Sequence, residues 1–193
     1  MRGWIFGMAA ALALGASMLT APAATAQATL QPANPQPGSV KPGLAVRYAY
    51  PADVKNLAQA RTALKYRSER GRPIAGLDNR DTNEGDITLT SKRAQRVVAH
   101  ITGYVKIDKP GIYNVDFLTN DGLLARVGGQ VVGHFDGRQA CDSTPLTQVR
   151  VPQAGWYPVD ILYFQRLGTS CLHMRMGPEG KRPPFMKNAA FGH

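Results

Sequence analysis

The feature that most constrains the fold is a series of short segments, between Ile87 and Met176, that alternate apolar and polar residues and are separated by turn residues. In the segment Arg96–Ile107 apolar side chains occupy every second position, and Ile112–Thr119 shows the same alternation. Successive side chains of a strand point to opposite faces, so this pattern indicates strands with one buried face. Further segments of this kind are 123–127, 131–135, 146–151, 156–164 and 171–176. Strands at this spacing predict an antiparallel β-sandwich or barrel.

Before this series the chain has a helical pattern. Leu44–Tyr50 reads as a strand that Pro51 ends, and Asp53 is a candidate N-cap for an amphipathic helix that runs to about Tyr66. The chain also has 20 Gly and 14 Pro among 193 residues, which favours turns over long helices. We therefore predict an all-β protein with one short helix, and exclude a helical bundle, a coiled coil and a multi-pass membrane protein.

The N-terminus has the pattern of a secretory signal peptide. Arg2 is followed by an uncharged apolar run and then by Ala24-Thr25-Ala26, where small residues occupy the positions that a signal peptidase reads. We expect a signal peptide over 1–26, although a membrane anchor is the alternative, and a periplasmic or secreted mature protein without a transmembrane segment. The Pro-rich residues 27–42 are expected to form a linker, residues 43–187 the folded domain and residues 188–193 a C-terminal tail.

The two cysteines, Cys141 and Cys171, both follow the expected signal peptide. An even number of cysteines in an oxidising compartment indicates a disulfide bond between them. The alternative is a free reactive thiol with His134 or His173 as its base.

Basic residues are concentrated in the expected helix and the loop after it. The chain carries a formal net charge of +10, and the cluster consists of Lys55, Arg61, Lys65, Arg67, Arg70 and Arg72. For an exported protein, we expect such a cluster to contact an anionic envelope polymer or an acidic protein surface and not nucleic acid. The alternative is a solvated helix face with no specific partner.

Catalytic motifs are not found in the sequence. It has no G-x-S-x-G or H-E-x-x-H pattern, and its carboxylates are few. His134 and Asp136 alternate at one strand end, but two ligands do not make a zinc site. We expect a protein that is not an enzyme and has no cofactor.

The order of turns and strands resembles the PA14 domain family. The resemblance rests on ITGYVKIDKPGIYNVDFLTNDGLLARVGGQVVGHFDG (Ile101–Gly137), with its P-G-x-Y and N-D-G turns and its G-G-Q-V-V hairpin. It continues in VPQAGWYPVDILYFQRLGTSCLHMRM (Val151–Met176) and in the opening strand GLAVRYAY near Gly43. No single motif is specific, but their order and spacing are. The family implies a β-sandwich that often binds carbohydrate at the tips of its loops.

In the sugar-binding members of this family, two consecutive aspartates joined by a cis peptide hold a calcium ion, which in turn holds sugar hydroxyls. The matching residues here are Asn120 and Asp121, so one carboxylate is replaced by an amide. Calcium affinity falls as the charge of its ligands falls, and we expect calcium to bind weakly here or not at all. The candidate ligand-binding residues are Asn120, Asp121, Gly122 and Asp136, with Asp142 nearby. The alternative is that Asn120-Asp121-Gly122 is only a hairpin turn.

These observations predict a non-catalytic binding module for a glycan or an anionic envelope polymer. The alternative is a protein-interaction or structural subunit of a cell-envelope or cell-surface assembly.

Overall fold

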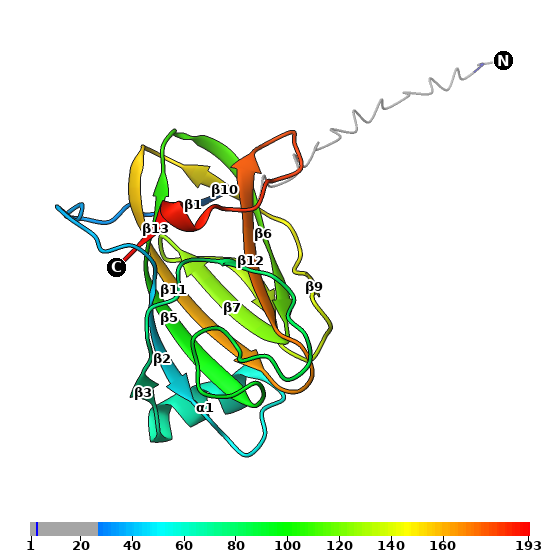
Figure 1. The fold of residues 1–193 in the computed structure, drawn as a ribbon. Helices are drawn as coiled ribbons and strands as arrows, with labels where there is room; N and C mark the ends of the chain where they lie inside the picture. The colour runs from blue at the N-terminus through cyan, green and yellow to red at the C-terminus, as the bar shows by residue number, and fades with distance from the viewer. Residues whose placement is uncertain (1–2, 4–26) are drawn as a thin grey trace.

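The computed structural model describes Gly3 and residues 27–193. The expected signal peptide, 1–26, therefore lies outside the described residues except for Gly3. The described chain forms two β-sheets, one α-helix and one short 3-10 helix (Figure 1). The elements are β1 (Ala28–Thr29), β2 (Ala45–Ala49), α1 (Leu57–Tyr66), β3 (Glu69–Arg70), β4 (Asp78–Asn79), β5 (Val97–Ile107), β6 (Gly111–Asn120), β7 (Gly122–Val127), β8 (Gln130–Phe135), β9 (Asp142–Ser143), β10 (Thr147–Val151), β11 (Gly155–Gln165), β12 (Cys171–Pro178), η1 (Asn188–Ala190) and β13 (Phe191–Gly192).

The two sheets form a β-sandwich. One sheet has the order β1-β10-β6-β12-β4 with β9 on β6, and the other has the order β3-β2-β5-β11-β7-β8 with β13 on β5. The strands within each sheet pair antiparallel, except that β1 pairs with β10 in parallel. Buried apolar side chains from both sheets fill the space between them, and the residues expected on the inner face of β5 are almost fully buried. The predicted all-β sandwich with one short helix is confirmed.

The helix covers the outer face of the second sheet at one end of the sandwich, where it packs on β11, β5 and β2 (Figure 1). Leu57 and Ala60 of α1 meet Phe164 of β11 in a second, smaller apolar cluster. The helix begins later than the sequence predicted, because Asn56 is its N-cap: the Asn56 side chain accepts a hydrogen bond from the Gln59 backbone N–H at 2.9 Å. Because Leu57 and Ala60 are the side of α1 that is buried against the sheet, the polar side chains of α1 point away from it.

Both ends of the described chain differ from the sequence prediction. Residues 27–42 are packed against the sandwich and do not form a free linker: Leu30 is fully buried and its backbone N–H donates to the Arg150 carbonyl. In the expected tail, Phe191 is buried and belongs to β13, which pairs with β5. A few apolar residues placed between prolines or near the terminus carry no periodic pattern, so their burial could not be detected from sequence.

One strand residue also differs from the expected alternation. The alternation in Ile112–Thr119 places the polar Asp116 of β6 on the solvent face, but Asp116 is 4% exposed and pairs with the guanidinium of Arg175, its cross-strand neighbour on β12. Ser143 of β9 and Phe185 of the C-terminal segment also lie against Arg175, so this part of the outer face is covered. Among the described residues no helix is long and apolar enough to cross a membrane.

Candidate functional site

The Asn120-Asp121 step is the point where the chain crosses from one sheet to the other. Asn120 ends β6 in the first sheet, and Gly122 begins β7 in the second. The alternative of a simple hairpin turn is therefore wrong, because β6 and β7 do not pair with each other. The peptide bond between Asn120 and Asp121 is cis, the form that the resemblance implied at this position.

Asn120 is buried and held by its neighbours at this crossing. Its side-chain N–H donates to the Thr169 hydroxyl at 3.1 Å, and its carbonyl accepts a hydrogen bond from the buried Tyr163 hydroxyl at 2.6 Å. The residue is 5% exposed. Asn120 therefore acts mainly as a structural link between β6 and the β11–β12 loop.

The Asp121 carboxylate ties two loops to the crossing. One of its oxygens accepts the backbone N–H of Gln139 at 3.2 Å, and the other accepts the backbone N–H of Arg166 at 2.7 Å. Burial raises the pKa of Asp121, while these two hydrogen bonds and the nearby charges of Arg138 and Arg166 act in the opposite direction. Each carboxylate oxygen thus accepts one backbone hydrogen bond within the protein.

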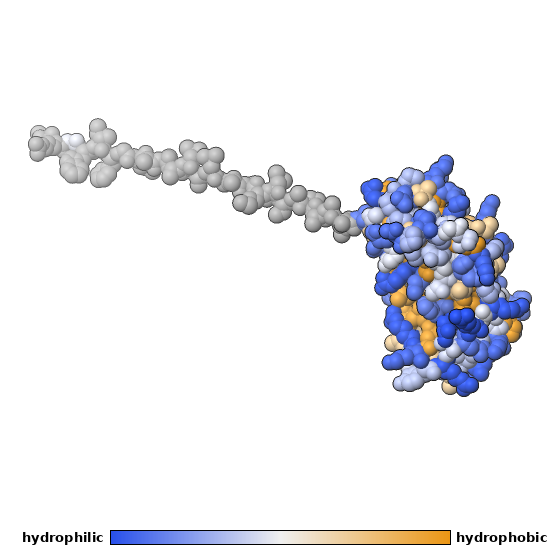
Figure 2. Space-filling view, turned by 90° about the vertical axis from the view of Figure 1, so that its left-hand side faces the viewer, coloured by the Kyte–Doolittle hydropathy of each residue, from blue (hydrophilic) through white to orange (hydrophobic). Residues whose placement is uncertain are grey.

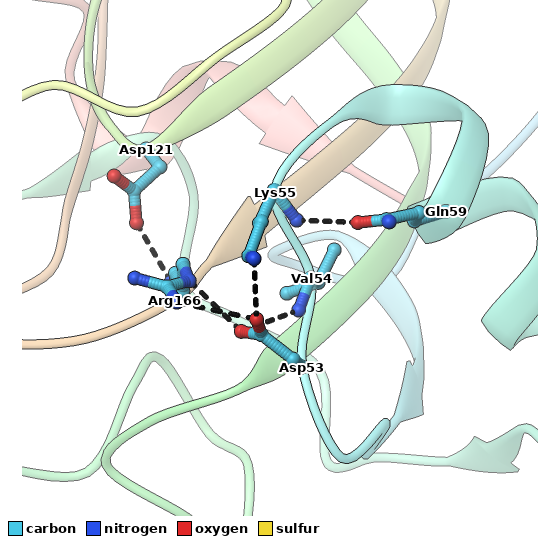
Figure 3. Close-up of polar contacts among 6 residues, drawn as sticks. All are labelled: Asp53, Val54, Lys55, Gln59, Asp121 and Arg166. Carbon is cyan, nitrogen blue, oxygen red and sulfur yellow. Dashed lines mark hydrogen bonds and ion pairs between the residues drawn. The ribbon is translucent and has the colours of Figure 1, made fainter.

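A third loop, which leads into α1, is attached through Asp53 (Figure 3). The Arg166 side chain reaches the Asp53 carboxylate with contacts of 2.8 and 3.2 Å, and Lys55 approaches the same carboxylate at 3.5 Å. The hydrogen bond from Arg166 is the main reason that the pKa of Asp53 falls to about 2. In Figure 3 the Arg166 residue lies between Asp121 and Asp53, so one residue joins the crossing to the helix segment.

The remaining acidic candidates are also engaged. Asp136 accepts the backbone N–H of Leu57, the first residue of α1, at 2.7 Å, and so satisfies one of the free donors at the helix N-terminus. Asp142 is exposed and accepts the backbone N–H of Ser143 at 2.6 Å. The contact of Asp136 in the structure is thus with the start of the helix.

Calcium does not fit this set of residues. The ion requires about six to eight oxygen ligands, several of them carboxylate. Here Asp121 is the one carboxylate of the Asn120-Asp121 pair, each of its oxygens accepts a backbone N–H group, and Arg138 and Arg166 place positive charge beside it. Within residues 27–193 the one group of three potential metal ligands is Asp81 with Cys141 and Cys171, whose sulfurs are bonded to each other.

The structure contains the predicted disulfide between Cys141 and Cys171. Cys171 begins β12 and pairs in register with Asn120, so the bond fastens the β8–β9 loop beside the crossing. Sequence reasoning missed Arg166, Gln139 and Thr169, which complete this arrangement. They are distant in sequence and belong to no motif, so no sequence signal could have identified them.

The six predicted basic residues are all exposed, on α1 and on the segments directly before and after it: Lys55, Arg61, Lys65, Arg67, Arg70 and Arg72. Among them only Lys55 forms an ion pair within residues 27–193. Figure 2 shows the side of the molecule on which β2 and β3 lie in Figure 1. Most residues visible on this side are hydrophilic, and some hydrophobic residues are exposed between them. We refer to these six residues as the basic face.

Two surface hollows of about 470 Å³ each adjoin the basic face. The helix-end hollow is lined by residues that include Tyr48, Tyr50, Tyr66, Arg67, Glu69 and Arg93. The sheet-face hollow is lined by residues that include Arg47, Arg70, His100, Thr102 and His193. Arg67 and Arg70 thus each line one hollow. Sequence analysis did not identify the contributions of Arg47 and Arg93, because only folding brings them next to the helix.

Comparison with known proteins identifies the family. The family model of the PA14 domain matches residues 41–183. The chain belongs to the PA14 domain family. Among curated proteins no match is found.

Solved PA14 structures share the fold at low sequence identity. The PA14 domain of the antifreeze protein MpAFP is 15% identical, with a TM-score of 0.67 over 81% of this chain and 92% of that domain. The PA14 sugar-binding domain of an RTX adhesin is 17% identical, with a TM-score of 0.61 over 80% of this chain and 99% of that domain. The A domain of Epithelial Adhesin 9 from Candida glabrata, solved with Galβ1-3GlcNAc, is 16% identical, with a TM-score of 0.64 over 86% and 95%. These likenesses establish the sandwich architecture.

Proposed function

We propose that this protein is a secreted or periplasmic, non-catalytic PA14 module that binds an anionic glycan or envelope polymer through its basic face. The observation that carries the proposal is the exposure of the six clustered basic side chains, five of which have no ion-pair partner within the described residues. Two of them, Arg67 and Arg70, line hollows large enough to admit a sugar ring. Membership of a family that includes sugar-binding domains supports a carbohydrate as the ligand.

The geometry favours binding through charge over binding through calcium. The candidate acids Asp121 and Asp136 accept hydrogen bonds from Arg166, Gln139 and the start of α1. A polyanion gains from several cationic groups at once, and such contacts weaken as ionic strength rises. The proposed binding is therefore independent of calcium and dependent on salt.

Binding of residues 27–193 to an acidic polysaccharide, measured at several salt concentrations with and without EDTA, tests the proposal. Replacing Arg61, Lys65, Arg67 and Arg70 together by Gln is expected to weaken binding strongly at low salt and to flatten its salt dependence. A matched control replaces Lys106, Lys109, Arg150 and Lys181, which are exposed and remote in sequence from α1, by Gln. Equal losses in both variants would mean that only net charge matters, and unchanged binding in the first variant would refute the proposal.

A further inference from the structure

The helix-end hollow combines aromatic and cationic side chains in one small volume. Tyr66, the last residue of α1, is 83% exposed, and Tyr50, just after β2, is partly buried at the edge of the hollow. Tyr48 beneath them is almost fully buried, and its ring stacks with that of Tyr50 at 6.3 Å. The hollow therefore has a fixed aromatic wall on one side and a freely exposed aromatic ring on another.

The position of Tyr66 is not explained by packing. Its ring is left exposed at the helix end, and tyrosine, which combines an apolar ring with a polar hydroxyl, is enriched at binding interfaces. Tyr50, in contrast, is anchored: its hydroxyl accepts the backbone N–H of Lys92 at 3.2 Å, and the Arg93 guanidinium lies 5.1 Å from its ring centre. This contact holds the Arg93 charge at the hollow.

The charges in the hollow select for an anion. Arg67 and Arg93 both line it, and neither forms an ion pair within residues 27–193. The one acid, Glu69, is already neutralised by Lys92 at 2.7 Å. A guanidinium presents parallel N–H donors that match the two oxygens of a carboxylate, so two free guanidinium groups beside an aromatic wall suit a planar acid group attached to a ring.

From this arrangement we infer that the helix-end hollow is a specific subsite for a carboxylate-bearing sugar residue, such as a uronic acid. The inference rests on the proposed function and names the ligand class of one part of the basic face. The apolar C–H face of the pyranose packs against Tyr50 or Tyr66, the carboxylate meets Arg67 and Arg93, and Glu69 accepts a hydrogen bond from a ring hydroxyl. The hollow is open to solvent, so neighbouring residues of a chain can continue along the basic face toward Arg70.

Binding of a short oligosaccharide distinguishes recognition by this subsite from general electrostatic attraction to a polyanion. The probe is a trisaccharide of galacturonic acid, and its methyl ester is the matched neutral ligand with the same rings. Calorimetry on residues 27–193 is expected to detect the acid form and to give much weaker binding of the ester. Backbone amide shifts in NMR are expected to concentrate at Tyr50, Tyr66, Arg67 and Arg93. Equal binding of acid and ester would overturn the inference.

Variants of the hollow test the role of each group. Arg67→Gln and Arg93→Gln are each expected to weaken trisaccharide binding by about tenfold or more, because each removes charged hydrogen bonds to the carboxylate. Tyr66→Ala is expected to weaken it by about three- to tenfold, whereas Tyr66→Phe keeps the ring and retains binding. The matched control, Lys106→Gln with Lys109→Gln, removes two exposed charges that are remote in sequence from α1 and should leave trisaccharide binding nearly intact.

The outcomes distinguish the subsite from the proposed function. Loss of trisaccharide binding in the Lys106 and Lys109 control as large as in the hollow variants would show bulk attraction and overturn the subsite. Failure of the trisaccharide to bind, while the acidic polysaccharide still binds through the basic face, would overturn the subsite and leave the proposed function standing. Failure of both ligands to bind would overturn both. Thermal unfolding of each variant checks that lost binding does not reflect lost folding.

Discussion

Removing the carboxylate of Asp116 should cost more stability than any other single change to an ion pair in this protein. Asp116 and Arg175 are 4% and 9% exposed, and the Arg175 guanidinium makes two hydrogen bonds to the carboxylate. In Asp116→Ala the guanidinium keeps only the Ser143 hydroxyl at 3.0 Å and the nearby Phe185 ring. A buried charge left without its partner typically costs about 3–5 kcal/mol.

The size of this effect can be measured by urea unfolding of residues 27–193 with the disulfide intact. For a domain of this size, a loss of 3–5 kcal/mol corresponds to a fall in Tm of about 6–20 °C. The double variant Asp116→Leu with Arg175→Met removes both charges and should recover most of the loss, since apolar replacements of a buried pair are often neutral or stabilising. The coupling between the two sites then follows from a double-mutant cycle.

An exposed ion pair provides the control. Glu69 and Lys92 lie 2.7 Å apart, but their side chains are 45% and 73% exposed, so Glu69→Ala should leave the unfolding midpoint almost unchanged. The reasoning is refuted if Asp116→Ala is as stable as this control, because Arg175 would then reach solvent without cost. It also fails if the double variant is no more stable than Asp116→Ala, since the loss would then come from packing and not from an unpaired charge.

Four further predictions follow from particular contacts. Reducing the Cys141–Cys171 bond, or replacing both residues by Ala, should lower stability by about 3–4 kcal/mol for a loop of 30 residues, as measured by urea unfolding with and without reductant. A Cβ at Gly122 would overlap the Phe164 ring, so Gly122→Ala should destabilise by about 1–3 kcal/mol, whereas Gly38→Ala, where nothing lies within 4 Å, is the control without a steric clash. Burial lowers the pKa of His173, so the native state binds fewer protons than the unfolded state. Stability should therefore fall as pH drops from about 6.5 through the lower native pKa, and less so in His173→Leu, which urea unfolding at pH 7.5 and 5 can compare. Asn120→Asp should raise calcium affinity above that of the wild type in calorimetry, and micromolar binding by the wild type would contradict the poor fit of calcium.

The sandwich could be predicted from sequence because its strands bury one face and expose the other. The alternation in Arg96–Ile107 and Ile112–Thr119 is a local signal, and it places most inward residues correctly. Asp116 breaks the rule because its partner and its cover come from β12, β9 and the C-terminal segment. No local pattern records that a charged outer position will be covered by distant parts of the chain.

The candidate site was predictable only in part, for a related reason. The position of the Asn120-Asp121 step and the clustering of basic residues are readable along the chain, because each lies within a short segment. The residues that contact Asp121 and complete the helix-end hollow cannot be read from the sequence in this way. Arg166 and Gln139 donate to Asp121 through their backbones, and a backbone donor can belong to any residue type. Arg93 reaches the helix-end hollow only through the packing of its loop against Tyr50.

The acids at the sheet crossing and the cations on the helix are parts of one arrangement. Asp121 holds Arg166, Arg166 holds Asp53 beside the segment that enters α1, and Asp136 binds the first N–H of the helix. Asp136 directly, and Asp121 through Arg166 and Asp53, thus fix the position of α1, with negative charge at its N-terminus where the helix dipole favours it. The helix in turn presents Arg61, Lys65 and Tyr66 to solvent in a fixed orientation. The charge available for a ligand at this end of the sandwich is therefore positive, which is the reason to seek its ligand among acidic sugars and not among neutral sugars bridged by calcium.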